Sequence, residues 1–439
     1  MQGTRFAPLV SDVAGLSPVR DVGRVIAVRA GLVEVIGLGA LARLGDRLRL
    51  TQRGGGVIMG EVLQLVDDRL LMLPESALAG VAVGDRVVLC GPATLAPDDS
   101  WIGRVIDPFG QPLDGRPLLR GTRSRSLTEP APSATARKPL GPRLETGMRV
   151  FNTLLPIVRG QRLGLFAGSG VGKTQLLGQL ARNMSADVAV IALIGERGRE
   201  VGEFVSRVLG PEGLSRAVVV VATSDQSPLM RRRAAWTAMS VAEHFRDAGQ
   251  NVLFLADSIT RFAEAHREIA IAAGEPASLR GFPASTAHMI MSLAERAGPG
   301  LEGDGDITAL LTVLVAGSDM EEPVADIVRG VLDGHVVLDR AIAERGRYPA
   351  IDLPRSVSRS LPEAATAAEN AMIADARRLL GAYDESQMMI RAGLYVAGSD
   401  PQLDRAVAIW PALDAFLAEA EPNTTADSFN RLALILRRA

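Results

Sequence analysis

Cysteine is nearly absent from this chain, which contains one cysteine, Cys90, among 439 residues. An intramolecular disulfide is therefore excluded, and a reducing compartment such as the cytosol is favoured. Cys90 follows three apolar residues, so we expect it to be buried as a small hydrophobic residue. Histidine is scarce too, and the four histidines lie far apart in the sequence. They show no metal-ligand spacing, so a transition-metal site made only of protein ligands is not expected.

Aromatic residues account for 4% of the chain, so the sequence offers no stacking surface for single-stranded nucleic acid. An excess of charge of one sign is also lacking, because 48 Lys and Arg residues stand against 50 Asp and Glu residues. The arginine run at 231–233 is the one local basic candidate, and such a run more often lies on a solvated helix face. We therefore expect no nucleic-acid partner. Apolar runs stay short of the ~20 residues of a membrane span, and the N-terminus lacks a signal-peptide pattern.

The length predicts two or three domains. Residues 22–92 alternate short apolar segments with Gly- and Asp-containing turns, which predicts a small antiparallel β-barrel. Residues 93–355 alternate apolar strands with helices, a pattern typical of an α/β core with a mostly parallel sheet. Residues 356–439 predict a helical domain, and residues 1–21 form an N-terminal segment without a strong amphipathic pattern. The expected core strands are 162–166, 188–194, 217–222, 252–256, 307–315 and 335–338, and the expected C-terminal helices include 363–380 and 402–418.

A glycine-rich turn separates the first of these strands from a helix-like stretch. Residues 167–174 read Ala-Gly-Ser-Gly-Val-Gly-Lys-Thr, with Ala where the strict phosphate-loop pattern has Gly. In such a turn, backbone N–H groups and the helix N-terminus point at one anion, the lysine reaches the β- and γ-phosphates, and the threonine ligates Mg²⁺. The sequence therefore predicts a site for a nucleoside triphosphate and Mg²⁺, formed by Gly168, Ser169, Gly170, Val171, Gly172, Lys173 and Thr174.

Two further strands end in carboxylates. The strand 252–256 is followed by Asp257, which a parallel sheet places at the edge where the phosphate loop lies, so that it can support the Mg²⁺ shell. The alternative is that Asp257 caps the following helix. Glu196 follows the strand 188–194 and can orient a water toward the γ-phosphorus. Taken alone, its segment also fits a charged surface turn.

The order of these motifs resembles the catalytic subunits of rotary ATPases and their secretion-system relatives. Within that superfamily the chain is similar to the flagellar and type III secretion export ATPases over roughly residues 22–400. The segments that carry the resemblance read Gly-Glu-Arg-Gly-Arg-Glu-Val at 195–201, Thr-Ser-Asp-Gln-Ser-Pro-Leu at 223–229, Asp-Ser-Ile-Thr-Arg-Phe-Ala at 257–263, Tyr-Pro-Ala-Ile-Asp at 348–352 and Ser-Val-Ser-Arg at 356–359. One departure is Phe151-Asn152, where the relatives usually have an aliphatic residue and Asp.

The resemblance implies a RecA-like core and a homohexamer that hydrolyses ATP between neighbouring subunits. It implies that Glu196 polarises the attacking water and that Arg197 lies near the γ-phosphate. It also implies that Tyr348 lies beside the adenine, and that Arg359 is an arginine finger entering the adjacent subunit's site. As alternatives, Arg359 and Arg355 could share a solvated helix face, and Tyr348 could be part of the core.

The resemblance further implies a cytoplasmic location, peripheral at the inner-membrane export apparatus. The implied partners are an export regulator, central-stalk-like proteins, chaperones with their cargo, and the export gate. A flagellar export ATPase is favoured over the ATPase of a virulence injectisome. A non-catalytic nucleotide-binding subunit is a further alternative, against which Glu196 speaks, and a nucleic-acid translocase has only the arginine run at 231–233 in its favour.

Overall fold

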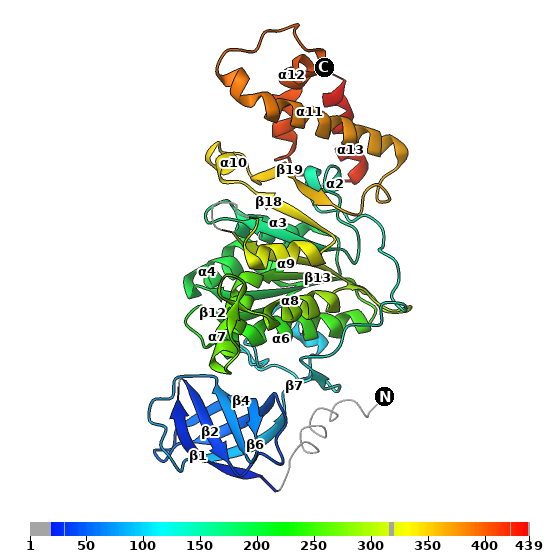
Figure 1. The fold of residues 1–439 in the computed structure, drawn as a ribbon. Coiled ribbons are helices and arrows are strands. Elements are labelled where there is room, and N and C mark those ends of the chain that lie inside the picture. The colour runs from blue at the N-terminus through cyan, green and yellow to red at the C-terminus, as the bar shows by residue number, and fades with distance from the viewer. Residues whose placement is uncertain (1–18, 30, 316–319, 422, 438–439) are drawn as a thin grey trace, which may run out of the picture.

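The computed structural model describes residues 19–29, 31–315, 320–421 and 423–437, so most of the predicted N-terminal segment 1–21 lies outside the described residues. Three parts follow one another along the molecule (Figure 1). A barrel lies at one end, a sheet covered by helices lies in the middle, and three helices lie at the other end. The predicted fold class is thereby confirmed in each of its three parts.

Six antiparallel strands close the N-terminal barrel in the order β1-β2-β5-β4-β3-β6. Alternate residues of each strand face the barrel interior, as in β3, where Leu48 and Leu50 are buried between partly exposed neighbours. This period of two is what a closed sheet with one apolar face requires. The strands are β1 (Val22–Arg29), β2 (Leu32–Ile36), β3 (Asp46–Thr51), β4 (Val57–Val66), β5 (Arg69–Pro74) and β6 (Arg86–Pro92).

Cys90 is exposed, so the expectation that it is buried is wrong. In β6, Val87 and Leu89 contribute to the barrel's hydrophobic cluster, so the next residue along the strand, Cys90, points outward. A bulge lies at the same position. Along β3, Arg47 pairs with Gly91 whereas the next residue, Leu48, pairs with Leu89, which leaves Cys90 without a partner residue. Its side chain therefore stays outside the apolar interior that Val87 enters.

The central sheet has the strand order β19-β18-β10-β17-β13-β11-β12-β8, and all neighbours are parallel except β18 and β19. The six strands expected from the sequence are present, and β8 and β19 extend the sheet at its two edges. β19 continues to Ser358, beyond residue 355 where the sequence predicts the core to end. The strands are β8 (Arg104–Ile106), β10 (Arg162–Ala167), β11 (Val188–Glu196), β12 (Ala217–Thr223), β13 (Val252–Asp257), β17 (Asp306–Leu314), β18 (Gly334–Leu338) and β19 (Ile351–Ser358).

Helices cover both faces of this sheet, which explains why its strands are apolar throughout. In β11, Ala189, Ile191 and Leu193 belong to one hydrophobic cluster, whereas the alternate residues belong to a second cluster on the opposite face. Each face needs its own apolar residues, so the strand cannot alternate with polar ones. The helices around the sheet are α3 (Lys173–Asn183), α4 (Gly198–Glu203), α5 (Gly210–Leu214), α6 (Pro228–Asp247), α7 (Ile259–Ala272), α8 (Ser285–Arg296), α9 (Pro323–Val331) and α10 (Arg340–Glu344).

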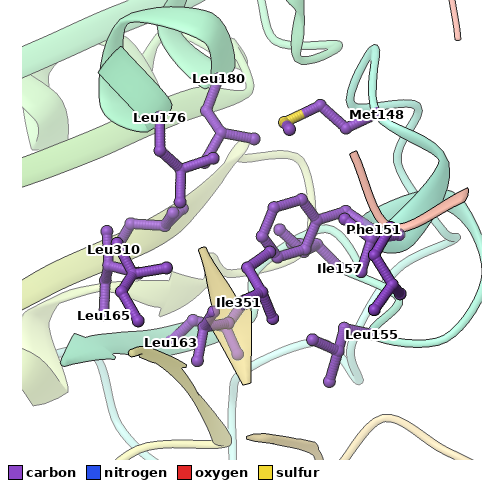
Figure 2. Close-up of a cluster of buried hydrophobic side chains, with 14 of the residues drawn as sticks. Met148, Phe151, Leu155, Ile157, Leu163, Leu165, Leu176, Leu180, Leu310 and Ile351 are labelled. Atoms are coloured by element: carbon purple, nitrogen blue, oxygen red, sulfur yellow. The ribbon is translucent and has the colours of Figure 1, made fainter. Parts of the chain in front are cut away.

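Helix α3 is anchored on the sheet by one of these clusters (Figure 2). Leu176 and Leu180 of α3 belong to the same cluster as Leu163 and Leu165 of β10, and Phe151 joins it from the short helix α2 (Arg149–Asn152). Burying a Leu or Phe side chain contributes about 1.5–3 kcal/mol. The start of α3, which carries the phosphate-loop lysine, is therefore fixed relative to the end of β10.

Asn152, the polar half of the Phe151-Asn152 departure, is buried with its hydrogen-bonding groups satisfied. Its Oδ1 accepts hydrogen bonds from the N (3.0 Å) and the Oγ1 (2.8 Å) of Thr146. Its Nδ2 donates to Ser428 Oγ (3.4 Å) in the C-terminal part. An aspartate could accept the first two bonds and could not donate the third. The neutral amide thus links the core to the C-terminal helices.

The C-terminal part consists of α11 (Ala367–Arg391), α12 (Pro401–Phe416) and α13 (Thr425–Leu436), as the sequence predicts. A capping box of Thr366 and Glu369 starts α11. No helix among the described residues has both the length and the apolar character to cross a bilayer. The remaining short elements are β7 (Thr94–Leu95), β9 (Arg125–Ser126), β14 (Ala277–Ser278), β15 (Phe282–Pro283), β16 (Gly298–Pro299), two 3-10 turns (Asp99–Trp101 and Leu279–Gly281) and a π-helical turn (Phe204–Leu209).

Arg233 of α6 joins the barrel to the core. Its side chain is 2% exposed and forms an ion pair with Glu61 of β4, while its Nε donates to the carbonyl of Pro108 (3.0 Å). Its guanidinium also lies 4.1 Å from the ring centre of Phe109. The expectation of a solvated face for the arginine run at 231–233 is therefore wrong for Arg233. Its length lets it reach across the domain junction to a buried carboxylate.

We expect Glu61→Gln to lower the free energy of unfolding by about 3–5 kcal/mol, because it leaves the buried Arg233 guanidinium without its counter-charge. Urea denaturation monitored by circular dichroism measures this loss. The control is Glu34→Gln, which breaks the Arg69 ion pair on the barrel surface, where the arginine side chain is 60% exposed. That variant should lose less than about 1 kcal/mol. Equal losses in the two variants would contradict a special role for the buried pair.

Candidate functional site

The phosphate loop connects the end of β10 to the start of α3. Gly170 has φ 78° and Gly172 has φ 83°, a region of backbone conformation that residues with a Cβ rarely adopt. Gly172 is the N-cap of α3, and Lys173 is the first residue of the helix. The unpaired N–H groups at this helix start form an anion site together with the turn. The local conformation is thus the one that the sequence predicts.

Lys173 joins two carboxylates that come from different strands. Its Nζ forms an ion pair with Asp257 Oδ1, at the end of β13, and lies 3.4 Å from Glu196 Oε1, at the end of β11. The order β10-β17-β13-β11 places all three residues at the carboxyl edge of the parallel strands. The structure therefore brings together Lys173, Glu196 and Asp257.

A bulge at Gly195 directs Glu196 toward Lys173. β11 pairs with β12 up to Ile194, and pairing resumes at Glu196, so Gly195 is left over. Its φ of 70° suits glycine, and a Cβ there would lie 3.0 Å from Arg261 Cβ. Without the bulge, Glu196 would share a face with Ile194; with it, Glu196 returns to the face of Leu193. That face is the one covered by α3.

The pKa values of this cluster reflect burial and mutual charge. Burial alone would lower the pKa of Lys173, but the negative charges of Asp257 and Glu196 outweigh it and raise that pKa. The pKa of Glu196 is raised by burial and, in second place, by repulsion from Asp257, while Lys173 opposes both. Lys173 is therefore firmly charged, and Glu196 is a stronger base than an ordinary glutamate.

Thr312 of β17 is a part of the site that sequence reasoning missed. Its Oγ1 donates a hydrogen bond to Asp257 Oδ1 (2.7 Å), and both residues are buried. The alternative role of Asp257 as a helix cap is not what the structure has. Ser258 caps α7, with its side chain accepting from the N of Arg261. A hydroxyl within the otherwise apolar end of β17 is the only signal that the sequence offers for Thr312.

A cavity of about 230 Å³ opens beside the cluster. Thr174, Glu196 and Asp257 line its polar side, and the π-helical turn contributes Phe204 and Val208. Among the described residues, no group of three or more His, Cys, Asp or Glu side chains could hold a metal ion. A divalent cation here would rely on Asp257 and Thr174 together with ligands from outside the protein. Mg²⁺ commonly binds in that manner, with few protein ligands.

Tyr348 lies at the phosphate loop rather than in the core. It is 51% exposed, and its ring approaches Gly172 so closely that a Cβ there would lie 2.9 Å from Tyr348 Cδ1. The alternative of core packing is therefore wrong. Its position between the loop and solvent leaves one side of the ring available to a planar ligand.

Arg197 is placed apart from the cluster. Its side chain is 77% exposed, pairs with Glu200 at 3.2 Å, and is not among the residues that line the cavity. Its backbone is the N-cap of α4.

Arg359 lies at the opposite edge of the sheet. It follows β19, and its backbone N donates to the carbonyl of Asp333 (3.0 Å). Asp333 in turn donates from its N to the carbonyl of Arg162, the first residue of β10. The six residues of β10 span about 17 Å at ~3.3 Å per residue. The structure thus does not bring Arg359 to Lys173 of its own chain, and the solvated-helix alternative is wrong because Arg355 and Arg359 belong to a strand and the turn after it.

Two protein-family models match parts of the chain. Residues 147–358 match the ATP synthase alpha/beta family, nucleotide-binding domain, and residues 365–433 match the T3SS EscN ATPase C-terminal domain. The Flagellum-specific ATP synthase of Caulobacter vibrioides is 46% identical over 440 residues, covering 98% of this chain and 99% of the relative. The protein of the same name from Salmonella typhimurium is 42% identical, covering 97% of this chain and 96% of the relative.

Solved structures agree with these matches. The assembled ATPase EscN of the enteropathogenic E. coli type III secretion system superposes with a TM-score of 0.86 at 35% identity, covering 94% of this chain and 100% of EscN. EscN in complex with its central stalk EscO superposes with a TM-score of 0.85 at 36% identity, with the same coverage. The chain therefore belongs to the ATP synthase alpha/beta family, in the branch that contains the flagellum-specific ATP synthases and EscN.

Proposed function

We propose that this protein hydrolyses ATP to energise protein export through a flagellar type III secretion apparatus, and that it acts as a homohexameric ring with sites between subunits. The cluster of Lys173, Glu196 and Asp257 at the phosphate loop is the observation that carries the proposal. Higher identity to flagellum-specific ATP synthases than to EscN favours the flagellar apparatus over an injectisome. Glu196 in contact with Lys173 argues against a non-catalytic subunit.

The phosphate loop, from Gly168 to Thr174, is proposed to bind the triphosphate of ATP. The N–H groups of the turn and of the α3 start supply donors, and Lys173 supplies a charge for the β- and γ-oxygens. Because Asp257 and Glu196 raise its pKa, Lys173 carries that charge throughout the physiological range. Tyr348, which lies against Gly172, is proposed to contact the adenine.

Thr174 and Asp257 are proposed to hold Mg²⁺. Both line the cavity beside the phosphate loop, and Asp257 is oriented by Thr312. When bound, Mg²⁺ neutralises charge on the transferring phosphoryl group. A hydroxyl and one carboxylate are oxygen ligands of the kind it prefers, and waters and phosphate oxygens complete such shells.

Glu196 is proposed to orient the attacking water and to accept its proton as the oxygen bonds to the γ-phosphorus. The bond between the γ-phosphorus and the β,γ-bridging oxygen breaks, so that ADP and phosphate result. The raised pKa of Glu196 makes it a better acceptor. Arg197 is proposed to approach the γ-phosphate, which requires its exposed side chain to turn away from Glu200.

We expect Glu196→Gln to lower turnover by about 10²–10⁴-fold, because the amide cannot accept the proton. ATP affinity should stay within about threefold, since the binding loop and Lys173 remain. Phosphate release and equilibrium binding of ATP measure the two effects. Glu212→Gln, an exposed carboxylate of α5, is the matched control and should leave both unchanged. Unchanged phosphate release by Glu196→Gln would remove Glu196 from its proposed role.

Thr312→Val should lower the apparent affinity for Mg²⁺, because Asp257 loses the hydrogen bond that orients it. A bond to a charged group contributes about 1.5–3 kcal/mol, so we expect the Mg²⁺ concentration for half-maximal activity to rise about tenfold. Thr312→Ser keeps the hydroxyl and should stay close to the wild type. If valine and serine behave alike, Thr312 does not position Asp257.

Arg359 is proposed to act in the neighbouring subunit's site, because it lies at the far edge of its own sheet from Lys173. An arginine finger contributes about 10³–10⁵ in rate. Rings of Arg359→Ala alone or Lys173→Ala alone should therefore be nearly inactive. In an equal mixture, about a quarter of the interfaces join an intact phosphate loop to an intact arginine, and ATPase activity should return in that proportion. Mixing Lys173→Ala with the Lys173→Ala/Arg359→Ala double variant controls for ring formation. Mixed rings without any recovery would contradict action in trans.

Partners and location are proposed by analogy. EscN was solved with its central stalk EscO, and we propose that this protein meets a corresponding stalk protein, an export regulator, chaperones with cargo, and the export gate. A cytoplasmic location, peripheral at the inner membrane, follows from such partners. We propose the domain division 22–92, 93–355 and 356–439, with β19 shared across its last boundary.

A further inference from the structure

Arg347 directly precedes Tyr348 and closes the turn that carries it. Arg347 is buried, with 8% of the residue exposed. Its Nη1 donates to the carbonyl of Pro349 (3.0 Å) and its Nη2 to the carbonyl of Ile351 (2.8 Å). The guanidinium therefore clamps the backbone on the far side of Tyr348, where the chain enters β19. A planar fork of donors suits two carbonyls at once, which a lysine could not bind in the same way.

The same guanidinium is in contact with the C-terminal helices. Its Nε lies 3.0 Å from Asp414 Oδ1 of α12, although the N–H does not point at that oxygen. The contact is thus one of charge rather than a directed hydrogen bond. Burial lowers the pKa of Arg347 and the negative charge of Asp414 opposes this most strongly. A guanidinium remains charged in either case.

The contact between Arg347 and Asp414 lies beside a cavity between the core and the C-terminal helices. A cavity of about 550 Å³ separates the end of α10 and the start of β19 from α11 and α12, and Arg347 and Asp414 both line it. Asp352 and Asp384 line it as well, and burial raises the pKa of each. Across this cavity, the pair of Arg347 and Asp414 is the charge contact that joins the turn carrying Tyr348 to α12.

We propose that Arg347 is a positioning residue that holds Tyr348 against the phosphate loop, and that Asp414 makes this position depend on the placement of α12. The inference rests on the proposed function, in which Tyr348 contacts the adenine. Arg347 itself touches neither nucleotide nor the reacting atoms. Its effect is therefore confined to the nucleoside end of the ligand, and a displacement of the C-terminal helices would change ATP affinity through it.

Binding of Mg-ATP compared with binding of magnesium triphosphate tests this separation. Triphosphate has the phosphates and lacks the nucleoside, so it reports the phosphate loop alone. We expect Arg347→Met to weaken ATP about tenfold and to leave triphosphate within about twofold, with KM rising more than kcat falls. Asp414→Asn should weaken ATP about threefold. The double variant should match Arg347→Met, because the two residues act through one contact.

Two controls keep the test decisive. Arg345→Met removes a neighbouring exposed arginine whose guanidinium lies 5.7 Å from the ring centre of Trp410 in α12, and it should change neither affinity. Arg347→Lys retains the charge beside Asp414 and loses the fork of donors, so its ATP affinity should fall between the wild type and Arg347→Met. If Arg347→Met fails to fold, Arg347→Lys tests the inference in its place.

The outcomes that overturn the inference are distinct. Equal weakening of ATP and triphosphate by Arg347→Met would mean a general structural role. Additive losses in the double variant would mean that Asp414 does not act through Arg347. If Tyr348→Ala leaves ATP affinity unchanged, the adenine contact fails and this inference fails with it, whereas the roles of Glu196 and Arg359 would stand. If Tyr348→Ala weakens ATP and Arg347→Met does not, only the inference is overturned.

Discussion

The charge balance around Lys173 is the constraint on which the site depends. Two carboxylates enter one partly buried space because the parallel strands β11 and β13 both end there. The two carboxylates repel each other, and removing each of them from water costs several kcal/mol. A cation between them offsets this cost, at roughly 4 kcal/mol per contact near 4 Å with an effective dielectric constant of about 20. The lysine that supplies this cation comes from the start of α3, which follows β10, two strands from β13 in the sheet.

Each of these three side chains needs a different structural device to reach this space. Lys173 needs the left-handed glycines of the loop, and Glu196 needs the bulge at Gly195. Asp257 needs a hydroxyl from β17, one strand away. The sheet, which helices cover on both faces, is a rigid base for these side chains. A register shift of one residue would move a carboxylate to the opposite face of the sheet. Precision at the site thus comes from strand register and not from the loop alone.

The sequence predicts what is encoded locally and misses what depends on pairing. The strand predicted at 252–256 and observed as Val252–Asp257 can be recognised from the sequence because both faces of the sheet require apolar residues. β19, with Pro354 and Arg355, carries polar residues, and the apolar pattern does not predict it. The bulges at Cys90 and Gly195, the bond from Thr312 and the pair of Arg347 with Asp414 all join residues far apart in the chain or depend on a register. No local pattern specifies them.

The edge strand β19 connects Tyr348 and Arg359, which the proposals assign to two different nucleotide sites of a ring. Its first residue, Ile351, is held by Arg347 beside Tyr348, and its last residue, Ser358, precedes Arg359. Between them, Arg377 of α11 donates to the carbonyls of Leu353 and Ser356. A strand of eight residues is stiff over its roughly 24 Å, and it is linked to the C-terminal helices near its start through Arg347 and Asp414 and along its length through Arg377. A movement of these helices would therefore shift two residues through the same strand. One is Tyr348 at one nucleotide site, and the other is Arg359, which is proposed to act at the next site. Because the strand lies at the edge of the sheet and pairs with β18 alone among the described strands, it can shift at a smaller cost than the strands that carry Lys173, Glu196 and Asp257.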